Sequence, residues 1–356
     1  MSYFLHQRHR VLWIFLSATF LGSGLSSGPG SGSVARAQST SASWIGAPLV
    51  GLLANPEMTE VRAIQGVPGS ATVSGPIRLP SGILKVHLAP AQGWALVEQA
   101  PVRTLGLLPF TGLQPGSIVP IDNVLSSPDI VSFSPAGRSA AIVANGAGMV
   151  QVLTGLDSAP RLAMQTGISG LGVVGAAAVS DDGTLTAVLT SDGRVFLLSG
   201  TQAPQLIFQA GSPAGMSFLP SEQALAIADG AAGTISVFDG LTHTPFVRSA
   251  MPGPNLSGDG ILVRASGDGQ SLFVAAHGGT SAYRIDFANQ SMSMLAVPAT
   301  LSELERLPGG DAFLFSANPG EAAWLLLSNG PNLSAVFAQS TEEPRLRRTA
   351  QPRPAR

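Results

Sequence analysis

The chain has 356 residues, of which 45% are hydrophobic and 11% charged, and its formal net charge is −2. This charge argues against a nucleic-acid-binding protein, and the hydrophobic content argues against an intrinsically disordered one. The absence of cysteine excludes disulfides, thiolate metal sites and a cysteine nucleophile, while 42 glycines, 27 prolines and a single lysine favour short strands joined by turns over long helices.

Residues 1–37 have the features of a secretory signal peptide. Arg8 and Arg10 precede an apolar run of 11 residues, Val11–Leu21, and Ala35-Arg36-Ala37 matches the A-x-A pattern of a cleavage site. The run is shorter than the roughly 20 residues that a membrane span needs. We therefore predict a Sec-type signal that is cleaved after Ala37, which places the mature protein in the periplasm or outside the cell. An N-terminus retained as a membrane anchor is the alternative.

Residues 38–338 are predicted to form one all-β domain, which begins with two strand-like runs. These runs are Pro48–Leu53 and Val61–Val67, and both are apolar and end near a proline. Two strands bury too little surface to be stable alone. We expect them to be completed by residues from the C-terminal part of the chain.

The rest of the domain is a repeat. In each copy an apolar stretch ends in a turn rich in Pro, Asp and Gly, a second apolar stretch follows, and a third stretch comes after a small polar turn. The first turns recur at spacings of 44, 46, 39, 47 and 41 residues, close to the roughly 40–45 residues of a four-stranded propeller blade. The turn positions are Gly93, Gly137, Gly183, Glu222, Gly269 and Gly310, and fourth strands are predicted at Arg161–Thr166, Gln205–Gln209, Pro245–Ala250, Ser291–Val297 and Leu333–Ala338.

Two segments of the repeat carry a resemblance to known families. Ser134-Pro135-Ala136-Gly137-Arg138 resembles the SPDGR-type turn of WD40-like bacterial propellers. Ala226–Asp229 followed by Gly233–Asp239 resembles the repeat of YVTN-type propellers. The resemblance covers about residues 83–338 and implies a β-propeller, but no particular activity. The Gly-His and Trp-Asp dipeptides of WD40 repeats are missing, so the scaffolding partners of those proteins are not implied.

The predicted fold class is therefore an all-β propeller of four-stranded blades. Six copies are visible, and the two N-terminal strands are interpreted as the outer half of a seventh blade that the C-terminal part completes. Seven blades are preferred, with six blades or a β-sandwich as alternatives. Residues 339–356 hold five arginines and three prolines and are predicted to be a disordered tail. Residues 38–338 alone carry 11 basic and 19 acidic side chains.

No catalytic, cofactor-binding or metal-binding set is predicted. The G-x-S-x-G match at Gly24–Gly28 lies in the signal peptide, and the G-x-G-x-x-G match at Gly170–Gly175 leaves no room for a helix before the next turn. The histidines of the domain have no second ligand at metal-binding spacing. These histidines are His87, His243 and His277, and we expect His87 to be packed because it alternates within a strand.

Two groups of residues are candidate sites. The turns between second and third strands open on one face of a propeller and carry polar side chains, which predicts a binding face; the preference of turns for such residues is the alternative. Glu303 and Glu305 share one face of an innermost strand and are predicted to line the axial channel, unless they face solvent or pair with Arg264 or Arg306. The binding-face residues are Asn145, Asp192, Asp229, His277 and Asn318.

The predicted function is that of an exported, non-enzymatic binding or scaffold module. We expect its partner to be a protein or a glycan and not a nucleic acid. We also expect a monomer that has no cofactor and no membrane span after signal cleavage. The alternative is a propeller enzyme of the lactonase, lyase or glycan-active type, with a site on the axial face. Such a site is assembled from distant blades and leaves no local motif.

Overall fold

The computed structural model describes residues 47–55, 59–67, 69–220, 223–309, 312–318, 322–330 and 332–341, all of which belong to one compact unit, Gly46–Arg356. The predicted signal peptide, residues 342–356 of the predicted tail, and the turn positions Glu222 and Gly310 lie outside the described residues. The described residues form strands and turns. None of them forms a helix long and apolar enough to cross a membrane.

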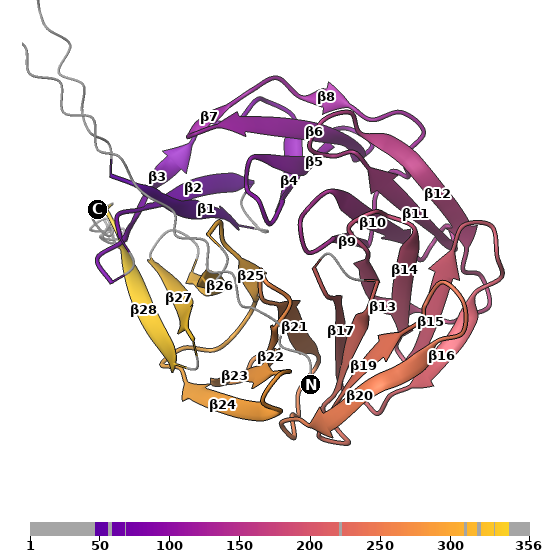
Figure 1. Ribbon diagram of the computed structural model, residues 1–356. Coiled ribbons are helices and arrows are strands. Elements are labelled where there is room, and N and C mark those ends of the chain that lie inside the picture. Colours follow the sequence, from indigo (N-terminus) through magenta and orange to yellow (C-terminus); the bar gives the residue numbers. More distant parts are fainter. Residues whose placement is uncertain are drawn as a thin grey trace, which may run out of the picture. The chain divides into compact units, whose positions relative to one another are not determined.

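The strands form antiparallel meanders around a central axis, as Figure 1 shows. Hydrogen bonds join the described strands into six sheets. Four sheets have four strands each: β9 (Ile130–Phe133), β10 (Ser139–Ala144), β11 (Met149–Thr154) and β12 (Arg161–Gly167); β13 (Val174–Val179), β14 (Leu185–Thr190), β15 (Arg194–Ser199) and β16 (Gln205–Gln209); β17 (Ala214–Phe218), β18 (Leu225–Asp229), β19 (Thr234–Asp239) and β20 (Phe246–Pro252); and β21 (Ile261–Ala265), β22 (Ser271–Ala276), β23 (Ser281–Asp286) and β24 (Ser291–Ala296).

The other two sheets contain the N-terminal and C-terminal strands. One has five strands: β4 (Ile83–Leu88), β5 (Trp94–Gln99), β6 (Thr104–Thr111), β7 (Gln114–Pro115) and β8 (Val119–Pro120). The last has seven strands in the order β1-β2-β3-β28-β27-β26-β25. Its strands are β1 (Leu49–Asn55), β2 (Glu60–Gln65), β3 (Thr72–Ile77), β25 (Glu305–Arg306), β26 (Ala312–Asn318), β27 (Ala322–Asn329) and β28 (Asn332–Ser340).

Burial depends on how far a strand lies from the axis. Every residue of β10, β14 and β22 is buried, whereas β16 and β24 on the rim are mostly exposed. The second strand of a sheet is covered by neighbouring sheets on both faces, so it carries apolar and small residues throughout. Apolar clusters fill the space between successive meanders; one of them joins Ala141 and Val152 to Val179 and Val188. Burial of this apolar surface stabilises the ring.

The first turn of the repeat is confirmed at Ser134–Arg138. The Ser134 N–H donates to Ser139 O, and the Gly137 N–H donates to Ser134 O, both at 2.9 Å. Gly137 has a φ of +76°, a left-handed conformation that glycine adopts without strain. Among the fourth strands, the prediction at Gln205–Gln209 coincides with β16.

The N-terminal strands differ from the prediction. Strand β1 is an innermost strand rather than part of the outer half of a blade, because Ala54 lines the axial cavity and Leu52 packs in a cluster with Val86 of β4. The run from residue 50 to residue 54 is apolar on both faces, which suits a strand covered on both sides. The position of this strand in the blade was predicted wrongly, because a strand next to the axis and a strand on the rim can have equally apolar sequences.

The ring is closed by its two ends. The first and last meanders join where β3 pairs with β28 in parallel, with Thr72 opposite Gln339 and Val73 opposite Ser340. The start of the predicted tail at residue 339 is therefore wrong, since residues 339 and 340 belong to β28. Counted as hydrogen-bonded sheets, the described strands make six units, and counted as meanders they make seven, because this pairing fuses two meanders.

Removing residues 339–356 is expected to lower the free energy of unfolding by about 1–2 kcal/mol, the value of one or two hydrogen bonds. The deletion takes away the pairing with β3 and the bonds that Thr341 N (2.9 Å) and Oγ1 (3.1 Å) donate to Val73 O. Urea denaturation measures the change. A chain that ends after Thr341 is the control, and equal loss in both truncated chains would contradict the assigned role of the closure.

Candidate functional site

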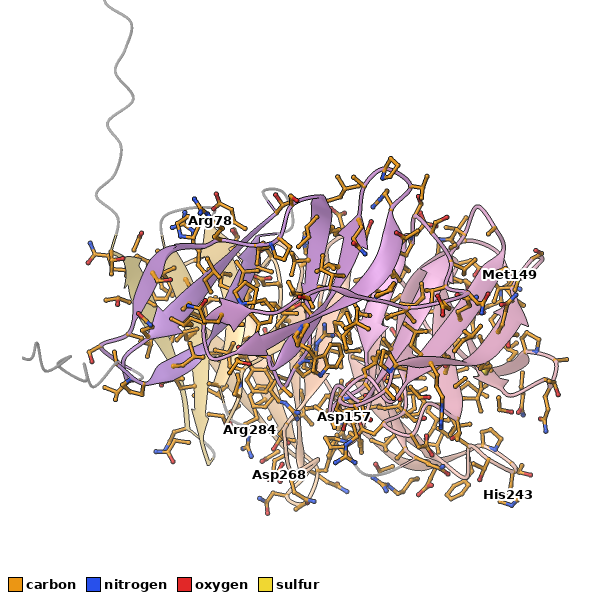
Figure 2. The ribbon with its side chains drawn as sticks, turned by 90° about the horizontal axis from the view of Figure 1, so that it is seen from above. Arg78, Met149, Asp157, His243, Asp268 and Arg284 are labelled. Carbon is orange, nitrogen blue, oxygen red and sulfur yellow. The ribbon has the colours of Figure 1, made fainter. Side chains whose placement is uncertain are left out.

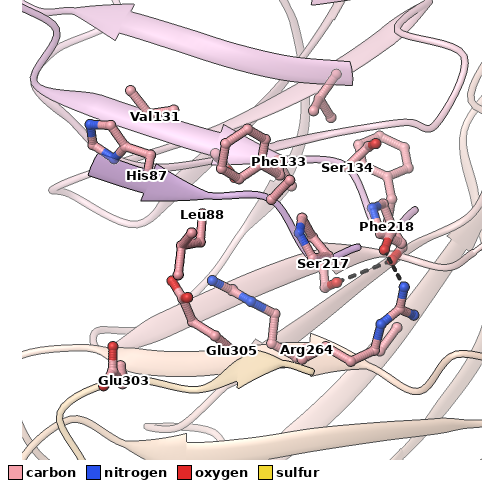
Figure 3. A pocket seen from close by; sticks show the side chains of 18 of the residues that line it. His87, Leu88, Val131, Phe133, Ser134, Ser217, Phe218, Arg264, Glu303 and Glu305 are labelled. Carbon is pink, nitrogen blue, oxygen red and sulfur yellow. Dashed lines mark hydrogen bonds between the residues drawn. The ribbon is translucent and has the colours of Figure 1, made fainter. Parts of the chain in front are cut away.

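A cavity of about 280 Å³ lies on the axis of the ring (Figure 3). Its lining includes residues from the innermost strand of every meander: β1, β4, β9, β13, β17, β21 and β25. Leu88, Phe133, Met216 and Phe218 form apolar walls. The charged and titratable lining residues are Lys85, His87, Arg264, Glu303, Glu305 and Arg306. Apolar walls with a few convergent polar groups are typical of a small-molecule site.

Glu303 and Glu305 both line this cavity. Glu305 begins the short strand β25, and Glu303 lies two residues before it. Neither carboxyl group makes a hydrogen bond or an ion pair with any residue that the structure describes. Both residues are half-buried, so their carboxyl groups remain open to the cavity. The two groups are therefore available to a ligand.

The surroundings of the two glutamates favour their protonated forms. Burial raises the pKa of Glu303 to about 8, and the neighbouring Glu305 adds to the increase while Arg264 opposes it. Burial also raises the pKa of Glu305, against the charges of Arg264 and His87. The pair consequently retains a proton at neutral pH. A carboxylic acid next to a carboxylate provides both a proton donor and a proton acceptor.

Arg264 carries the charge that faces the two glutamates. Its Nη1 donates to the carbonyl oxygen of Val263 at 2.9 Å, and it makes no ion pair within the described residues. Protein surrounds the guanidinium on the axis, yet the side chain stays open to solvent through the channel. Arginine has five N–H donors in a planar fork. Most of these donors are free to bind a carboxylate or phosphate.

The Arg306 side chain makes a hydrogen bond across the axis of the ring. Its Nη2 donates to Pro135 O at 2.6 Å, which connects β25 to the turn after β9. Three innermost strands (β13, β17 and β21) separate β9 from β25 along one side of the ring, and two (β4 and β1) along the other, so this hydrogen bond crosses the axis. It narrows the cavity at the end where the first turns lie.

A third polar feature of the cavity was not predicted from the sequence. His87, which we expected to be packed, lines the cavity, and its Nε2 lies 3.0 Å from Oε1 of Glu98. The Glu98 side chain is 0% exposed, and its Oε2 accepts a 2.6 Å bond from Nε of Arg103. Burial acts to raise the pKa of Glu98, but the hydrogen bonds and charges of His87 and Arg103 outweigh it and hold the pKa below its usual value. The available signal was an acidic residue inside the apolar strand Trp94–Gln99.

The residues predicted to form a binding face lie in the turns between second and third strands, at the opposite end of the strands from the first turns, whose residues Pro90 and Pro135 line the cavity. In Figure 2, Met149, which begins the strand after one of the predicted turns, lies higher than Asp268, which belongs to the first turn of another meander. The Asn145 side chain donates to Val174 O (3.1 Å) and accepts from Val174 N (2.9 Å), which ties two neighbouring sheets together. Asp229 is 6% exposed and accepts bonds from the N–H groups of Gly211 and Ala232.

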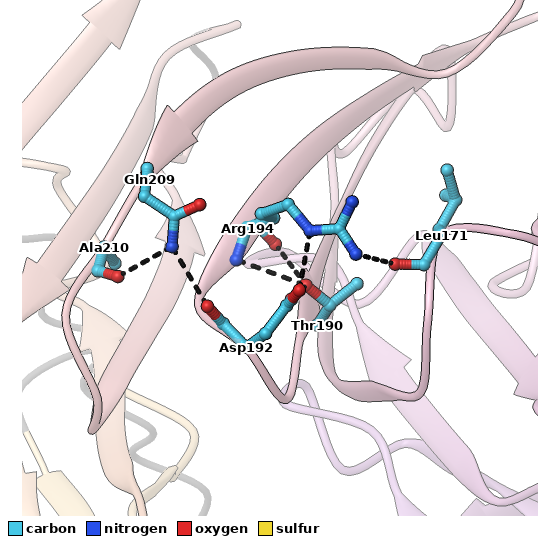
Figure 4. Close-up of polar contacts among 6 residues, drawn as sticks. All are labelled: Leu171, Thr190, Asp192, Arg194, Gln209 and Ala210. Atoms are coloured by element: carbon cyan, nitrogen blue, oxygen red, sulfur yellow. Dashed lines mark hydrogen bonds and ion pairs between the residues drawn. The ribbon is translucent and has the colours of Figure 1, made fainter.

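The remaining residues of that group differ from one another. Asp192 accepts bonds from Thr190 Oγ1 and Arg194 Nε within its own turn (Figure 4). His277 is exposed, and Asn318 ends β26 with its side chain outside the described ones. Through these hydrogen bonds Asn145, Asp192 and Asp229 stabilise the turns and hold neighbouring segments together. A shared binding face stays a prediction.

No group of three or more His, Asp or Glu side chains among the described residues is placed to hold a metal ion. The polar groups of the cavity instead come in a form suited to an organic ligand: a guanidinium, two carboxyl groups and an imidazole around apolar walls.

Comparison with known proteins bears on the fold. No protein-family model matches the sequence, and no curated protein is significantly similar to it. The periplasmic gluconolactonase of Pseudomonas aeruginosa matches the structure with a TM-score of 0.54 at 16% identity, over 82% of this chain and 96% of that one. A functionally unknown protein from Desulfotomaculum acetoxidans matches with a TM-score of 0.55 at 15% identity, over 82% and 100% of the two chains.

A third solved structure with a similar fold contains WD40 repeats. The WD40 repeats of RRP9 match with a TM-score of 0.50 at 11% identity, over 81% of this chain and 86% of that one. Identities this low show a common fold and nothing about activity. Together with the antiparallel meanders around one axis, these likenesses show that the chain has the β-propeller fold.

Proposed function

We propose that this propeller binds a small polyhydroxylated acid in its axial cavity. The observation that carries the proposal is the convergence of Arg264, Glu303 and Glu305, none of which has an ion-pair partner among the described residues. The guanidinium fork of Arg264 suits a carboxylate, and the two glutamates suit hydroxyl groups. The volume of about 280 Å³ lies near the lower end of ligand pockets, which favours a molecule of monosaccharide size.

The charge of the cavity favours an anion. Lys85, Arg264 and Arg306 bring three positive charges to its lining, while the glutamate pair retains a proton at neutral pH. The lining is therefore net positive even though the domain as a whole is acidic. An anionic ligand is drawn to this local charge over the short range that salt leaves unscreened.

Hydrolysis of a lactone is the second candidate, favoured by the raised pKa of Glu303. Ionised Glu305 would accept a proton from an attacking water, Arg264 would stabilise the developing oxyanion, and protonated Glu303 would donate a proton to the ring oxygen as the acyl C–O bond breaks. One lactone and one water give one hydroxy acid, and the pair recovers its original protonation by exchange between the two carboxyls. The structural likeness to a gluconolactonase supports the choice of substrate to test.

Calorimetric titration with D-gluconate at pH 7 tests the binding proposal. We expect saturable binding of one molecule per chain, and binding of neutral D-glucitol weaker by about 10- to 100-fold, because a charge-assisted hydrogen bond is worth about 1.5–3 kcal/mol. A pH-stat assay with D-glucono-δ-lactone tests hydrolysis. Absence of gluconate binding together with no hydrolysis above the spontaneous rate would overturn the proposed function. Binding without hydrolysis would support the non-enzymatic form.

We further propose that the protein works outside the cytoplasm, on the strength of the signal-like residues 1–37. Expression of the full chain in a bacterial host followed by N-terminal sequencing is expected to give a soluble exported product that starts at Gln38. Replacement of Ala35 and Ala37 by leucine is the control and is expected to prevent cleavage. A product that starts at Met1 in the membrane fraction would instead support the anchor.

A further inference from the structure

The side chains of Arg103, Glu98 and His87 are joined by hydrogen bonds. They lead from the solvent-exposed side of the sheet that contains β4, β5 and β6 to the axial cavity. The Arg103 side chain is 44% exposed, the Glu98 side chain is 0% exposed and the His87 side chain is 15% exposed. Arg103 Nε lies 2.6 Å from Glu98 Oε2, and His87 Nε2 lies 3.0 Å from Glu98 Oε1. The fully buried Glu98 carboxylate thus lies between the Arg103 guanidinium and the His87 imidazole, and the imidazole is the group that lines the cavity.

This arrangement determines the tautomer of His87. Arg103 keeps Glu98 ionised, and an ionised carboxylate only accepts hydrogen bonds. Nε2 of His87 must therefore carry a hydrogen and donate it to Glu98. In the neutral imidazole, Nδ1 then holds a free lone pair, and no described residue makes a hydrogen bond to it.

Charged groups from several strands surround His87. Lys85 lies two residues earlier on β4, Glu98 and Arg103 lie behind the ring, and Glu305 belongs to β25. His87 and Glu305 are close enough for the charge of His87 to lower the pKa of Glu305. From β9, the cavity neighbours are the uncharged side chains of Val131 and Phe133 (Figure 3).

We propose that His87 is a further proton-exchanging residue of the axial site, beside the glutamate pair, and that Glu98 and Arg103 position it so that Nδ1 meets the ligand. This inference rests on the ligand site proposed above. The neutral imidazole accepts a hydrogen bond from a ligand hydroxyl at Nδ1. When a proton moves from solvent or from the ligand to Nδ1, the imidazolium pairs with the ligand carboxylate while the Glu98 carboxylate balances its charge. No bond other than N–H and O–H changes.

Nitrogen NMR of the histidine-labelled protein tests the positioning without any ligand. The wild type is expected to show the Nε2–H tautomer at His87, assigned by the loss of its signals in His87→Gln. Glu98→Gln is expected to give a mixture of tautomers, because the amide no longer demands a donor. An Nδ1–H tautomer in the wild type would overturn the proposal. An unchanged tautomer in Glu98→Gln would do the same.

Titration with D-gluconate between pH 5 and 9 tests the contact with the ligand. The wild type is expected to bind more tightly toward the acidic end of this range, because protonated His87 pairs with the ligand carboxylate in the proposed site. His87→Gln is expected to lose this increase and to bind about two- to tenfold more weakly, the value of one hydrogen bond. His243→Gln, which changes an exposed histidine of the loop between β19 and β20, is the control and should behave as the wild type.

The outcomes separate this inference from the function on which it rests. Equal affinity and an equal pH profile in His87→Gln and the wild type would overturn the role of His87 while leaving the gluconate site in place. Absence of gluconate binding in every variant would overturn the proposed function. The tautomer measured by NMR would then still decide whether Glu98 positions His87.

Discussion

Replacing Glu98 with alanine is expected to lower the free energy of unfolding by about 3 kcal/mol. Breaking a buried ion pair by removing one partner costs about 3–5 kcal/mol, because the other charge is left without compensation. Here the effect falls at the lower end of that range. The Arg103 side chain is 44% exposed, so water compensates its charge when Glu98 is removed. Urea denaturation at pH 7 measures the loss.

The same residue makes the stability depend on pH. The folded-state pKa of Glu98 is below the value of 4.5 for a free side chain, so the folded form holds its proton less tightly than the unfolded form. The contribution is therefore complete above about pH 5 and disappears as pH falls through the folded pKa. Glu98→Gln has no such group, and its stability should fall less steeply between pH 5 and 3 than that of the wild type.

A matched control separates this effect from the loss of any acidic residue. Asp239 and Arg248 form a surface pair 3.6 Å apart in which both side chains are 40% exposed. Asp239→Asn removes the charge, and its side-chain oxygen can still accept the bond from Gly240 N. Because exposed pairs contribute about 1 kcal/mol or less, the change should stay below that value. A loss from Glu98→Ala as small as that of the control would show that the buried network does not stabilise the ring.

Arg264→Gln is expected to weaken the binding of D-gluconate by about 10- to 100-fold, because it removes the charge that pairs with the ligand carboxylate. The substitution should leave the free energy of unfolding nearly unchanged, since Arg264 makes no ion pair with a described residue and donates only to the carbonyl of Val263. The combination of lost affinity and kept stability distinguishes a ligand-binding residue from a structural one. Calorimetry and urea denaturation measure the two quantities.

The charge of Arg264 also reaches the glutamate pair. It opposes the effect of burial on Glu303 and Glu305, so its removal should raise the pKa of Glu303 above about 8. Arg161→Gln is the control, because Arg161 is an exposed residue at the start of β12 on the rim. Affinity equal to the wild type in Arg264→Gln, or an equal loss in Arg161→Gln, would contradict the assignment.

The strands and turns of this protein follow from its sequence to a large extent. The turn at Ser134–Arg138 and the fourth strand at Gln205–Gln209 were predicted with their boundaries, because turn glycines and apolar stretches depend on neighbouring residues. The repeat spacing then sufficed to predict a propeller, since each copy needs a neighbour on either side to cover its faces.

The candidate site was predicted only in part. Glu303 and Glu305 were candidates for the channel lining, with solvent exposure or pairing with Arg264 or Arg306 as the alternative, and the structure places both in the cavity lining. The link between His87 and Glu98 was missed because a histidine in an alternating strand has the same pattern whether it packs or faces a cavity. Asn145 and Asp229 bond to the backbone of other segments, and their choice as binding residues took no account of those partners.

The sequence by itself determined the local structure of this protein: the strands, the tight turns, the repeat and hence the propeller class. The tertiary structure decided which strands face the axis, how β3 and β28 close the ring, and which charged groups meet in the cavity. The physical reason is that closure brings together residues far apart in the chain, such as Arg306 and Pro135, 171 positions apart. The surroundings that raise the pKa of Glu303 arise from that closure. They cannot be read from the residues next to Glu303 in the sequence.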